Sequence, residues 1–171
     1  MDWTDSQIDG FRIRDAVPHD VPLILKFIRE LAEYEKLSHE VVADEQILRR
    51  NLFGDNRNAE VVLGYEQSRP AAFALFFHNF STFLGKPGLY LEDLFVKPEF
   101  RGKGYGTMML AFLAKLAVDR NCGRLEWWVL DWNESAINFY KKIGAEPMDE
   151  WTVYRVAGKR LEQLSNRFES S

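Results

Sequence analysis

The apolar and polar positions of this chain follow two different periods, and each period predicts one kind of element. Short apolar or alternating runs, bounded by turn-forming residues, predict strands over residues 11–14, 59–65, 71–80, 89–96, 124–130 and 151–156. Apolar residues at helical spacing predict helices over residues 20–34, 43–52, 107–120 and 134–142, followed by a basic, weakly helical tail over 159–168. The resulting order, β-α-α-β-β-β-α-β-α-β, predicts an α/β fold with a mixed central β-sheet flanked by helices.

Local signals mark the ends of two of these helices. Asp20 is expected to cap the first helix. Pro22 suits the first turn of that helix, because backbone N–H groups there have no intrahelical partner and proline has none to lose. Asn133 is expected to cap the helix over 134–142. Gly144 follows the last turn of that helix, where a left-handed residue commonly ends it. These signals fix boundaries that periodicity alone leaves open.

Length and composition predict one globular domain. The chain has 171 residues, with 46% hydrophobic and 28% charged residues, which is ordinary for a globular protein that buries a core. We expect an N-terminal arm over residues 1–10, a single domain over 11–160 and a C-terminal tail over 161–171. A single cysteine excludes an intrachain disulfide, and no apolar run approaches membrane-spanning length. The expected location is therefore cytoplasmic.

The net charge bears on the class of partner. A formal net charge of −4 argues against general nucleic-acid binding and mildly favours a small cationic substrate. The three histidines are scattered without metal-ligand spacing, so no metal site is expected.

A glycine-rich turn lies between the strand over 89–96 and the helix that follows it. Residues 101–106 read R-G-K-G-Y-G, and glycine lets the backbone approach a ligand closely. The free N–H groups at the start of a helix suit a phosphate or pyrophosphate, and Arg101 and Lys103 add positive charge. The turn lacks the spacing of a P-loop and is a poor dinucleotide fingerprint, because no acidic residue is placed to bind a ribose.

Two motifs in order resemble those of the GNAT acetyltransferases. Arg101, Gly104 and Gly106 match the R-x-x-G-x-G motif of that family. The second motif lies at the family's distance from the first and comprises Asn133, Ala136, Phe139, Tyr140, Gly144 and Ala145. The stretches LAEYEKL at 31–37, LYLEDLFV at 89–96 and DWNESAINFYKKIGA at 131–145 look like the diamine acetyltransferase branch, which includes spermidine/spermine and thialysine acetyltransferases.

The resemblance implies acetyl-CoA as cosubstrate. Its pantetheine arm would lie between the strands over 89–96 and 124–130, which part in this family. One backbone N–H there would stabilise the developing oxyanion. The implied cofactor-binding residues are Leu94, Phe95, Val96, Arg101, Gly102, Lys103, Gly104, Tyr105, Gly106, Thr107, Asn133, Glu134, Ser135, Ala136 and Tyr140.

Two side chains are implied to be catalytic. Tyr140 would protonate the departing coenzyme A thiolate, since a phenol with an ordinary pKa of about 10 keeps its proton at neutral pH. Glu92 would remove a proton from the substrate ammonium, directly or through water. A carboxylate in an otherwise apolar strand costs desolvation unless it has a partner or a function. Strand alternation sends Asp93 to the opposite face, where a structural anchor is expected.

The substrate-binding residues implied by the diamine branch are Tyr34, Glu35, Ser81, Glu92, Glu126, Trp127 and Trp128. A carboxylate suits a remote ammonium group, and a tryptophan can cover a cation or fill the core. At the position of Ser81 the spermidine/spermine enzymes have an acid, whereas the thialysine relatives have serine. Serine at position 81 therefore favours the thialysine-like side. The expected substrate is therefore a small primary amine or amino acid, with short diamines still open.

Three functions remain open at this point. The first is a diamine- or thialysine-type N-acetyltransferase that works by direct attack in a ternary complex, as a homodimer, without nucleic-acid or membrane partners. The second is an acetyltransferase for another amine, such as a protein N-terminus or an antibiotic. The third is a coenzyme A-binding module without catalysis, which would have no need of Glu92 and Tyr140.

Overall fold

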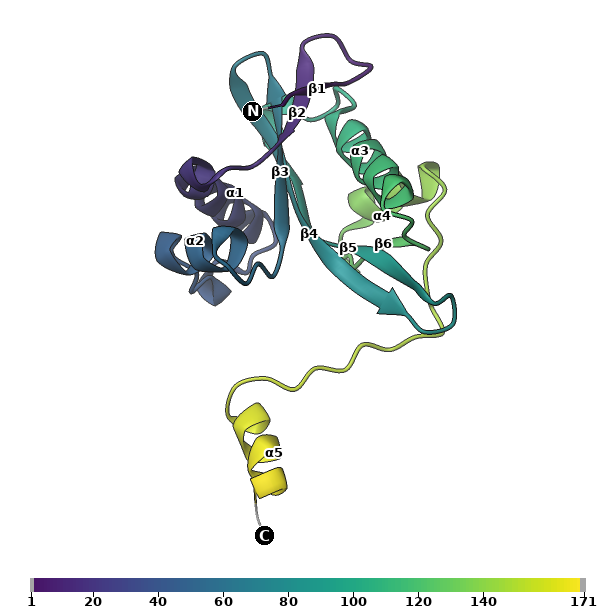
Figure 1. The fold of residues 1–171 in the computed structure, drawn as a ribbon. Coiled ribbons are helices and arrows are strands. Elements are labelled where there is room, and N and C mark those ends of the chain that lie inside the picture. The colour runs from purple at the N-terminus through teal and green to yellow at the C-terminus, as the bar shows by residue number, and fades with distance from the viewer. Residues whose placement is uncertain (1, 170–171) are drawn as a thin grey trace. The chain divides into compact units, whose positions relative to one another are not determined.

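A six-stranded sheet forms the centre of the computed structural model, which describes residues 2–169 (Figure 1). The strands follow one another across the sheet in chain order, and all neighbours are antiparallel except β5 and β6, which are parallel. Their bounds are β1 Thr4–Asp5, β2 Phe11–Asp15, β3 Glu60–Glu66, β4 Arg69–Ser81, β5 Lys86–Val96 and β6 Leu125–Trp127. This mixed sheet confirms the expected α/β fold, and the N-terminal arm adds β1 to its edge.

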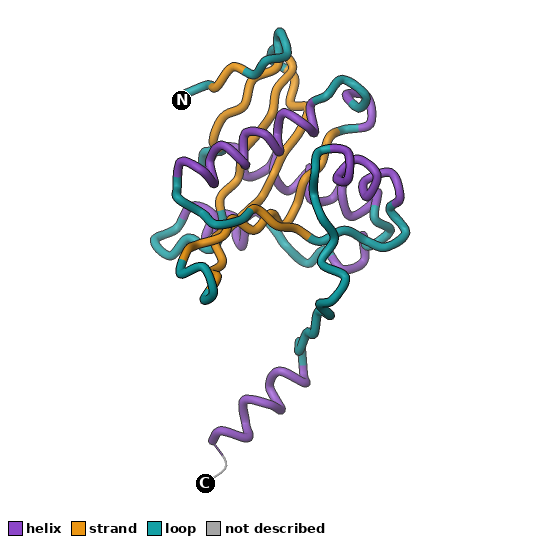
Figure 2. Tube along the Cα trace, turned by 90° about the vertical axis from the view of Figure 1, so that its right-hand side faces the viewer, coloured by secondary structure: helices purple, strands orange, loops and turns teal. Residues whose placement is uncertain are grey.

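The chain divides into two compact units, one ending at Leu130 and the other beginning at Asp131. The first holds the whole sheet and the helices α1 (Val21–Tyr34), α2 (Glu45–Phe53) and α3 (Tyr105–Asp119). Short 3₁₀ turns lie at Pro18–Asp20, Ser38–Glu40 and Pro98–Phe100. In Figure 1, α1 and α2 lie on one face of the sheet and α3 on the other, and the tube in Figure 2 shows the same strands edge to edge.

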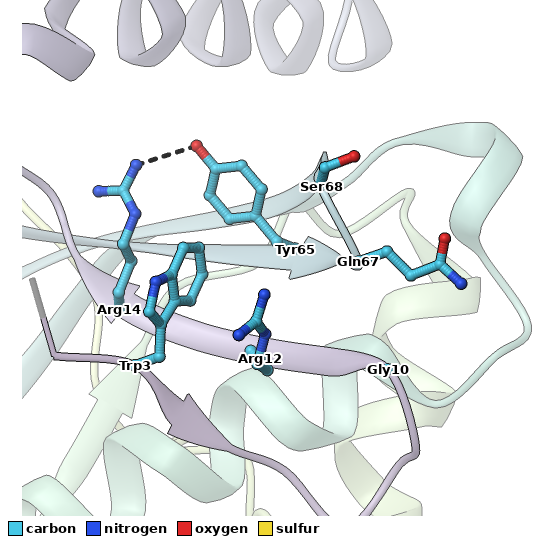
Figure 3. A pocket seen from close by; sticks show the side chains of 7 residues that line it. All are labelled: Trp3, Gly10, Arg12, Arg14, Tyr65, Gln67 and Ser68. Carbon is cyan, nitrogen blue, oxygen red and sulfur yellow. Dashed lines mark hydrogen bonds between the residues drawn. The ribbon is translucent and has the colours of Figure 1, made fainter.

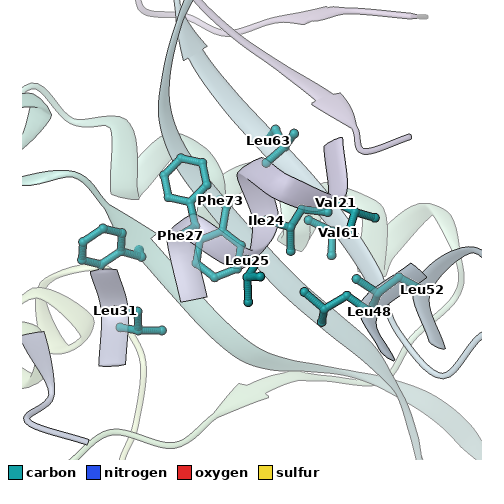
Figure 4. Close-up of a cluster of buried hydrophobic side chains, with 11 residues drawn as sticks. Val21, Ile24, Leu25, Phe27, Leu31, Leu48, Leu52, Val61, Leu63 and Phe73 are labelled. Atoms are coloured by element: carbon teal, nitrogen blue, oxygen red, sulfur yellow. The ribbon is translucent and has the colours of Figure 1, made fainter. Parts of the chain in front are cut away.

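Apolar side chains of α1 and α2 pack on one face of the sheet (Figure 4). The Phe27 ring stacks on the Phe73 ring with centroids 5.1 Å apart, and both side chains are fully buried. The remaining members of the cluster are Val21, Ile24, Leu25, Leu31, Leu48, Leu52, Val61, Leu63 and Phe95. Removing so much apolar surface from water is the main force that holds the helices on the sheet.

On the opposite face, α3 lies close against the sheet. The rings of Phe11 and Tyr105 stack with centroids 4.1 Å apart. A Cβ added at Gly64 would come within 2.6 Å of the Phe11 ring and 3.0 Å of the Met109 sulfur. Glycine at position 64 therefore allows β3 and α3 to approach without a side chain between them.

Asp20 lies at the start of α1, but it does not cap the helix as expected. Arg14 Nη1 and Nη2 donate to its carboxylate at 2.6 and 2.8 Å, and the Val17 N–H donates to it at 2.8 Å. Burial alone would raise the pKa of Asp20, but the hydrogen bonds from Arg14 and Val17 outweigh it and lower the pKa. A buried arginine on the neighbouring strand thus takes the carboxylate that a cap would need.

The second unit contains α4 (Glu134–Lys142) and α5 (Lys159–Glu169). Asn133 caps α4 as predicted, because its side chain accepts from the Ala136 N–H at 3.2 Å. At the other end Gly144 has a φ of 88°. The N–H groups of Gly144 and Ala145 donate to carbonyls in the last turn at 3.1 and 3.0 Å, which closes a Schellman motif.

The strand expected over 151–156 is wrong for the structure described here. These residues form neither strand nor helix, and the side chains of Trp151 and Tyr154 are 72% and 91% exposed. Alternating apolar residues suit a strand, but a strand needs a partner for its backbone groups, and no described segment supplies one. None of the described helices is long and apolar enough to cross a membrane.

Candidate active site

The parallel strands β5 and β6 separate after three residue pairs. Leu89, Tyr90 and Leu91 align with residues 125–127, and β6 then ends at Trp127 while β5 continues to Val96. The backbone of β5 beyond Leu91 therefore has no partner in β6. This is the parting of strands that the sequence resemblance implied, and it leaves the β5 groups over 92–96 open on that side.

A β-bulge lies where the strands part. Asp93 pairs with Leu75 of β4 and Leu91 pairs with Phe76, so Glu92 is an extra residue without a cross-strand partner. A bulge interrupts the alternation of side chains along a strand and redirects them. The expectation that Glu92 and Asp93 point to opposite faces assumed an unbroken pleat, which this bulge interrupts.

Three carboxyl groups meet at this bulge. Burial, and after it the negative charges of Glu92 and Glu35, together raise the pKa of Asp93 to about 7. Burial also raises the pKa of Glu35, which follows the last residue of α1. Glu92 itself is exposed. Asp93, which was expected to be a structural anchor, is thus the carboxyl group that the fold perturbs most.

The glycine-rich turn has the backbone conformation that its sequence predicted. Gly102 and Gly104 have φ values of 77° and 83°, which side-chain-bearing residues rarely adopt. Gly104 is the N-cap residue of α3, and no side chain caps that helix. The first-turn N–H groups of α3 are therefore available for an anion. The helix begins at Tyr105, two residues earlier than periodicity predicted.

The two basic residues of the turn have different surroundings. Arg101 donates from Nε to the Val96 carbonyl at 3.0 Å, which leaves the outer edge of its guanidinium for a ligand. Lys103 instead donates to Glu66 at 2.6 Å, and the Tyr105 hydroxyl donates to the same oxygen at 2.5 Å. Burial, and the hydrogen bond from the Tyr105 hydroxyl to Glu66, raise the pKa of Tyr105 to about 12. Glu66 thus neutralises part of the charge that Lys103 was expected to offer.

A groove of about 480 Å³ joins the end of α1 to the glycine-rich turn. Arg101 stacks on the Tyr34 ring, with its guanidinium carbon 4.6 Å from the ring centroid. Sequence reasoning missed two further cations in this groove, because lysines on a helix face and after a strand look like solvated surface. The lining residues are Lys26, Glu30, Glu33, Tyr34, Phe95, Lys97, Pro98, Glu99 and Arg101.

Two other expected substrate residues, Ser81 and Glu126, are held by neighbouring groups. Ser81 pairs with Lys86 at the far end of β4, six positions beyond Leu75 and so roughly 20 Å along the strand. Its buried hydroxyl accepts from the Leu84 N–H at 3.3 Å. Glu126 is held by the Asn79 amide at 2.5 Å and by the Arg124 Nε at 3.0 Å. Local structure accounts for both side chains.

The tryptophans and the second motif complete the expected set. Trp127 is half-buried, and Trp128 is 57% exposed, with its ring edge-to-face with that of Tyr90 at 5.7 Å. Neither fills the core. In the second unit, Tyr140 is half-buried on α4, with its ring 5.4 Å from that of Phe139. The four expected cofactor residues over 133–136 form the cap and first turn of the same helix.

Comparisons with known proteins show the family of the chain. Residues 25–145 match the sequence model of the Acetyltransferase (GNAT) family. The chain is 37% identical over 167 residues to a thialysine N-epsilon-acetyltransferase of Mus musculus, covering 91% of this chain and 98% of the relative. It is 34% identical to an L-ornithine N5-acetyltransferase of Arabidopsis thaliana, covering 90% and 87%. An integron cassette protein of V. cholerae has a similar structure, with a TM-score of 0.77 and 30% identity over 91% of this chain and 98% of that one.

Proposed function

Because the chain belongs to the GNAT acetyltransferase family, we propose that it transfers an acetyl group from acetyl-CoA to a primary amine of a small cationic substrate. The family implies acetyl-CoA as cosubstrate. The proposed acceptor is thialysine, a lysine- or ornithine-like amino acid, or a short diamine or polyamine. The relatives named for thialysine and L-ornithine support this class, since both compounds carry a primary amine at the end of a flexible chain.

The observation that carries this proposal is the position of the three carboxyl groups. Asp93 lies where β5 and β6 part, close enough to Glu92 and Glu35 to interact with their charges. Burial first, and the repulsion from these two carboxylates second, raise the pKa of Asp93 to about 7. Carboxylates that repel one another are stabilised by a cation placed among them. A site of this kind attracts an ammonium group and disfavours an anionic acceptor.

The glycine-rich turn fits the diphosphate of coenzyme A. The uncapped N-terminus of α3 offers N–H groups, and Arg101 offers charge-assisted hydrogen bonds from its outer edge. The backbone of Leu94, Phe95 and Val96 beside the gap would bind the pantetheine arm. Bound acetyl-CoA supplies the activated acetyl carbonyl, and the chain's own residues supply position, charge and proton transfer.

The proposed reaction is a direct transfer within a ternary complex. A carboxylate at the bulge takes a proton from the substrate ammonium, and the neutral amine nitrogen then attacks the thioester carbonyl. The carbon–nitrogen bond forms as the carbon–sulfur bond breaks, and Tyr140 gives its proton to the departing thiolate. The second proton that the nitrogen loses on becoming an amide restores the Tyr140 hydroxyl. Sequence favoured Glu92 as the base. The burial and pKa of Asp93 make it the stronger candidate for that role, with Glu92 and Glu35 binding the cation.

A substrate panel tests the proposed function. We expect thiol release from acetyl-CoA with thialysine, L-lysine, L-ornithine and putrescine. For thialysine we expect kcat/KM at least about tenfold above that for spermidine. A difference of a single small group between two substrates commonly changes kcat/KM by about this factor. A peptide N-terminus and an aminoglycoside serve as comparison acceptors. Release with these two alone would favour the alternative acetyltransferases, and binding of acetyl-CoA without release to any amine would favour a non-catalytic module.

We further propose that the protein is a homodimer assembled through residues 151–156. The alternating apolar residues of this segment are exposed, with Val153 55% and Tyr154 91% accessible, and exposed patches of this kind mark interfaces. At the sheet edge β6 is short and has no partner beyond it among the described strands. Light scattering is expected to give twice the 20.0 kDa of the chain. Val153→Asp should shift the mass toward that of one chain, and a wild-type monomer would refute the proposal.

A further inference from the structure

A second pocket lies on the first unit, at the sheet edge formed by the N-terminal arm. Its volume is about 630 Å³, and we refer to it as the Trp3 pocket (Figure 3). The lining residues are Trp3, Gly10, Arg12, Arg14, Tyr65, Gln67 and Ser68. None of them belongs to the expected acetyl-CoA or amine sites, so the pocket calls for a separate explanation.

Two arginines of β2 flank the indole of Trp3 (Figure 3). The guanidinium carbon of Arg12 lies 4.6 Å from the Trp3 ring centroid, and that of Arg14 lies 5.3 Å from it. A guanidinium stacked on an aromatic ring keeps its N–H donors in its own plane, directed away from the ring. The indole therefore holds the Arg12 fork in place without using any of its hydrogen bonds.

Arg12 makes no hydrogen bond or ion pair within the described residues, although it is half-buried. Asp5 stands opposite Arg12 in the β1–β2 register, but it is exposed and forms no ion pair with it. Five donors of a partly buried, permanently charged side chain are thus without a protein acceptor. The acceptors for these donors come from outside the chain, either from water or from a bound anion.

The neighbouring arginine adds a second unsatisfied donor. Arg14 is only 6% exposed, and its Nη1 and Nη2 donate to Asp20 at 2.6 and 2.8 Å. Its Nε has no partner among the described residues. Arg14 Nη2 also donates to the Tyr65 hydroxyl oxygen at 3.0 Å, so the hydroxyl proton of Tyr65 remains for another acceptor. Asp20 balances the charge of Arg14, and the net positive charge of the pocket resides on Arg12.

We propose that the Trp3 pocket binds a small molecule through a carboxylate or phosphate group. Two oxygens of that group accept from the planar edge of Arg12, in the bidentate arrangement that arginine forms with both anions. The Tyr65 hydroxyl donates to a third lone pair. The aromatic faces of the pocket are already occupied by the arginines and by the edge-to-face contact of Trp3 with Tyr65, so the anionic group provides the recognition.

Titration of the ¹⁵N-labelled full-length protein tests the site. Inorganic phosphate and acetate are added separately at constant ionic strength, and the Trp3 indole N–H and the Arg12 Nε–H are followed by NMR, with Trp3→Phe assigning the indole signal. We expect saturable shifts of both signals with at least one anion. Saturation with phosphate only or acetate only identifies the group, and either result supports the site.

Three variants make the result decisive. Arg12→Gln is expected to weaken the apparent affinity by about tenfold or more, because two charge-assisted hydrogen bonds are lost. Arg12→Lys keeps the charge without the planar fork and should weaken it as well. Arg49→Gln removes the same charge from an exposed arginine of α2 and should change nothing. Linear shifts with both anions, or equal saturation in wild type and both Arg12 variants, would overturn the proposal.

Discussion

Tyr140→Phe is expected to lower kcat for acetyl transfer by about 100-fold or more, the range in which a positioned general acid contributes. The substitution removes one oxygen and leaves the half-buried ring on α4. Without the phenol, the coenzyme A thiolate must depart unprotonated or take a proton from water. The KM for acetyl-CoA should change little, because the lost interaction belongs to the transition state. Steady-state kinetics with a saturating amine measures both constants.

The matched control is Tyr154→Phe, which removes the same hydroxyl from a 91% exposed tyrosine of the same unit. Because Tyr154 lies in the proposed dimer segment, light scattering should first show that the variant keeps the wild-type mass. It should leave kcat unchanged. Thermal unfolding of both variants separates a chemical effect from a loss of stability. A Tyr140→Phe enzyme with wild-type turnover would show that another group protonates the thiolate.

Asp93→Asn is expected to lower kcat/KM for the amine by about 100-fold, a typical contribution of a general base. A base with a pKa of about 7 is well matched to neutral pH. Wild-type kcat/KM should rise as the pH increases through 7, because the deprotonated carboxylate is the active form. The variant should lack this inflection, while the KM for acetyl-CoA stays within a few-fold of wild type. Initial rates measured from roughly pH 5.5 to 9, a range that spans the pKa of Asp93, would show whether the inflection is present.

Glu92→Gln and Asp55→Asn complete this comparison. Asp55 is exposed in the loop after α2, so its variant should behave as wild type. Glu92→Gln should mainly raise the KM for the amine, because the neutral amide no longer attracts the ammonium. If Glu92→Gln lowers kcat more than Asp93→Asn does, Glu92 is the base that the sequence indicated.

The carboxyl group of Asp93 also makes the free energy of unfolding depend on pH. Because the pKa of Asp93 is raised in the folded protein, the native state keeps a proton that the unfolded chain loses between about pH 4 and 7. The free energy of unfolding therefore falls as pH rises through that window. After allowance for partial solvent exposure, Asp93→Asn should remove roughly 2 kcal/mol of this fall. Urea unfolding at pH 5 and pH 8 measures the difference between the two proteins.

Elements with local determinants were predictable from the sequence. Helix α4 begins and ends where expected, because Asn133 and Gly144 act through neighbours within a few residues. The left-handed turn at Gly104 follows from glycine itself. The two motifs also indicated the glycine-rich turn that we propose to bind acetyl-CoA, since phosphate binding by backbone amides needs a fixed spacing of glycines.

Features that depend on distant partners were not predictable. Asp20 resembles a helix cap in sequence, but Arg14 takes its carboxylate. The bulge at Glu92 arises from the register with β4, which the sequence of β5 alone does not encode, and at this bulge Asp93 is half-buried while Glu92 is exposed. The segment over 151–156 has the pattern of a strand and lacks a described partner. In each case, the local sequence suits the expected structure, but contacts with another segment of the chain determine whether that structure forms.

The close contact at Gly64 has a consequence for natural variation. A side chain at position 64 would collide with the Phe11 ring and press on the Met109 sulfur of α3, so we expect it to push α3 away from the sheet. The N-terminus of α3 is the proposed seat of the coenzyme diphosphate, so a lifted helix would carry that seat with it. We therefore expect a substitution at position 64 to weaken coenzyme binding although this residue touches no part of the proposed site, and related sequences should rarely differ here.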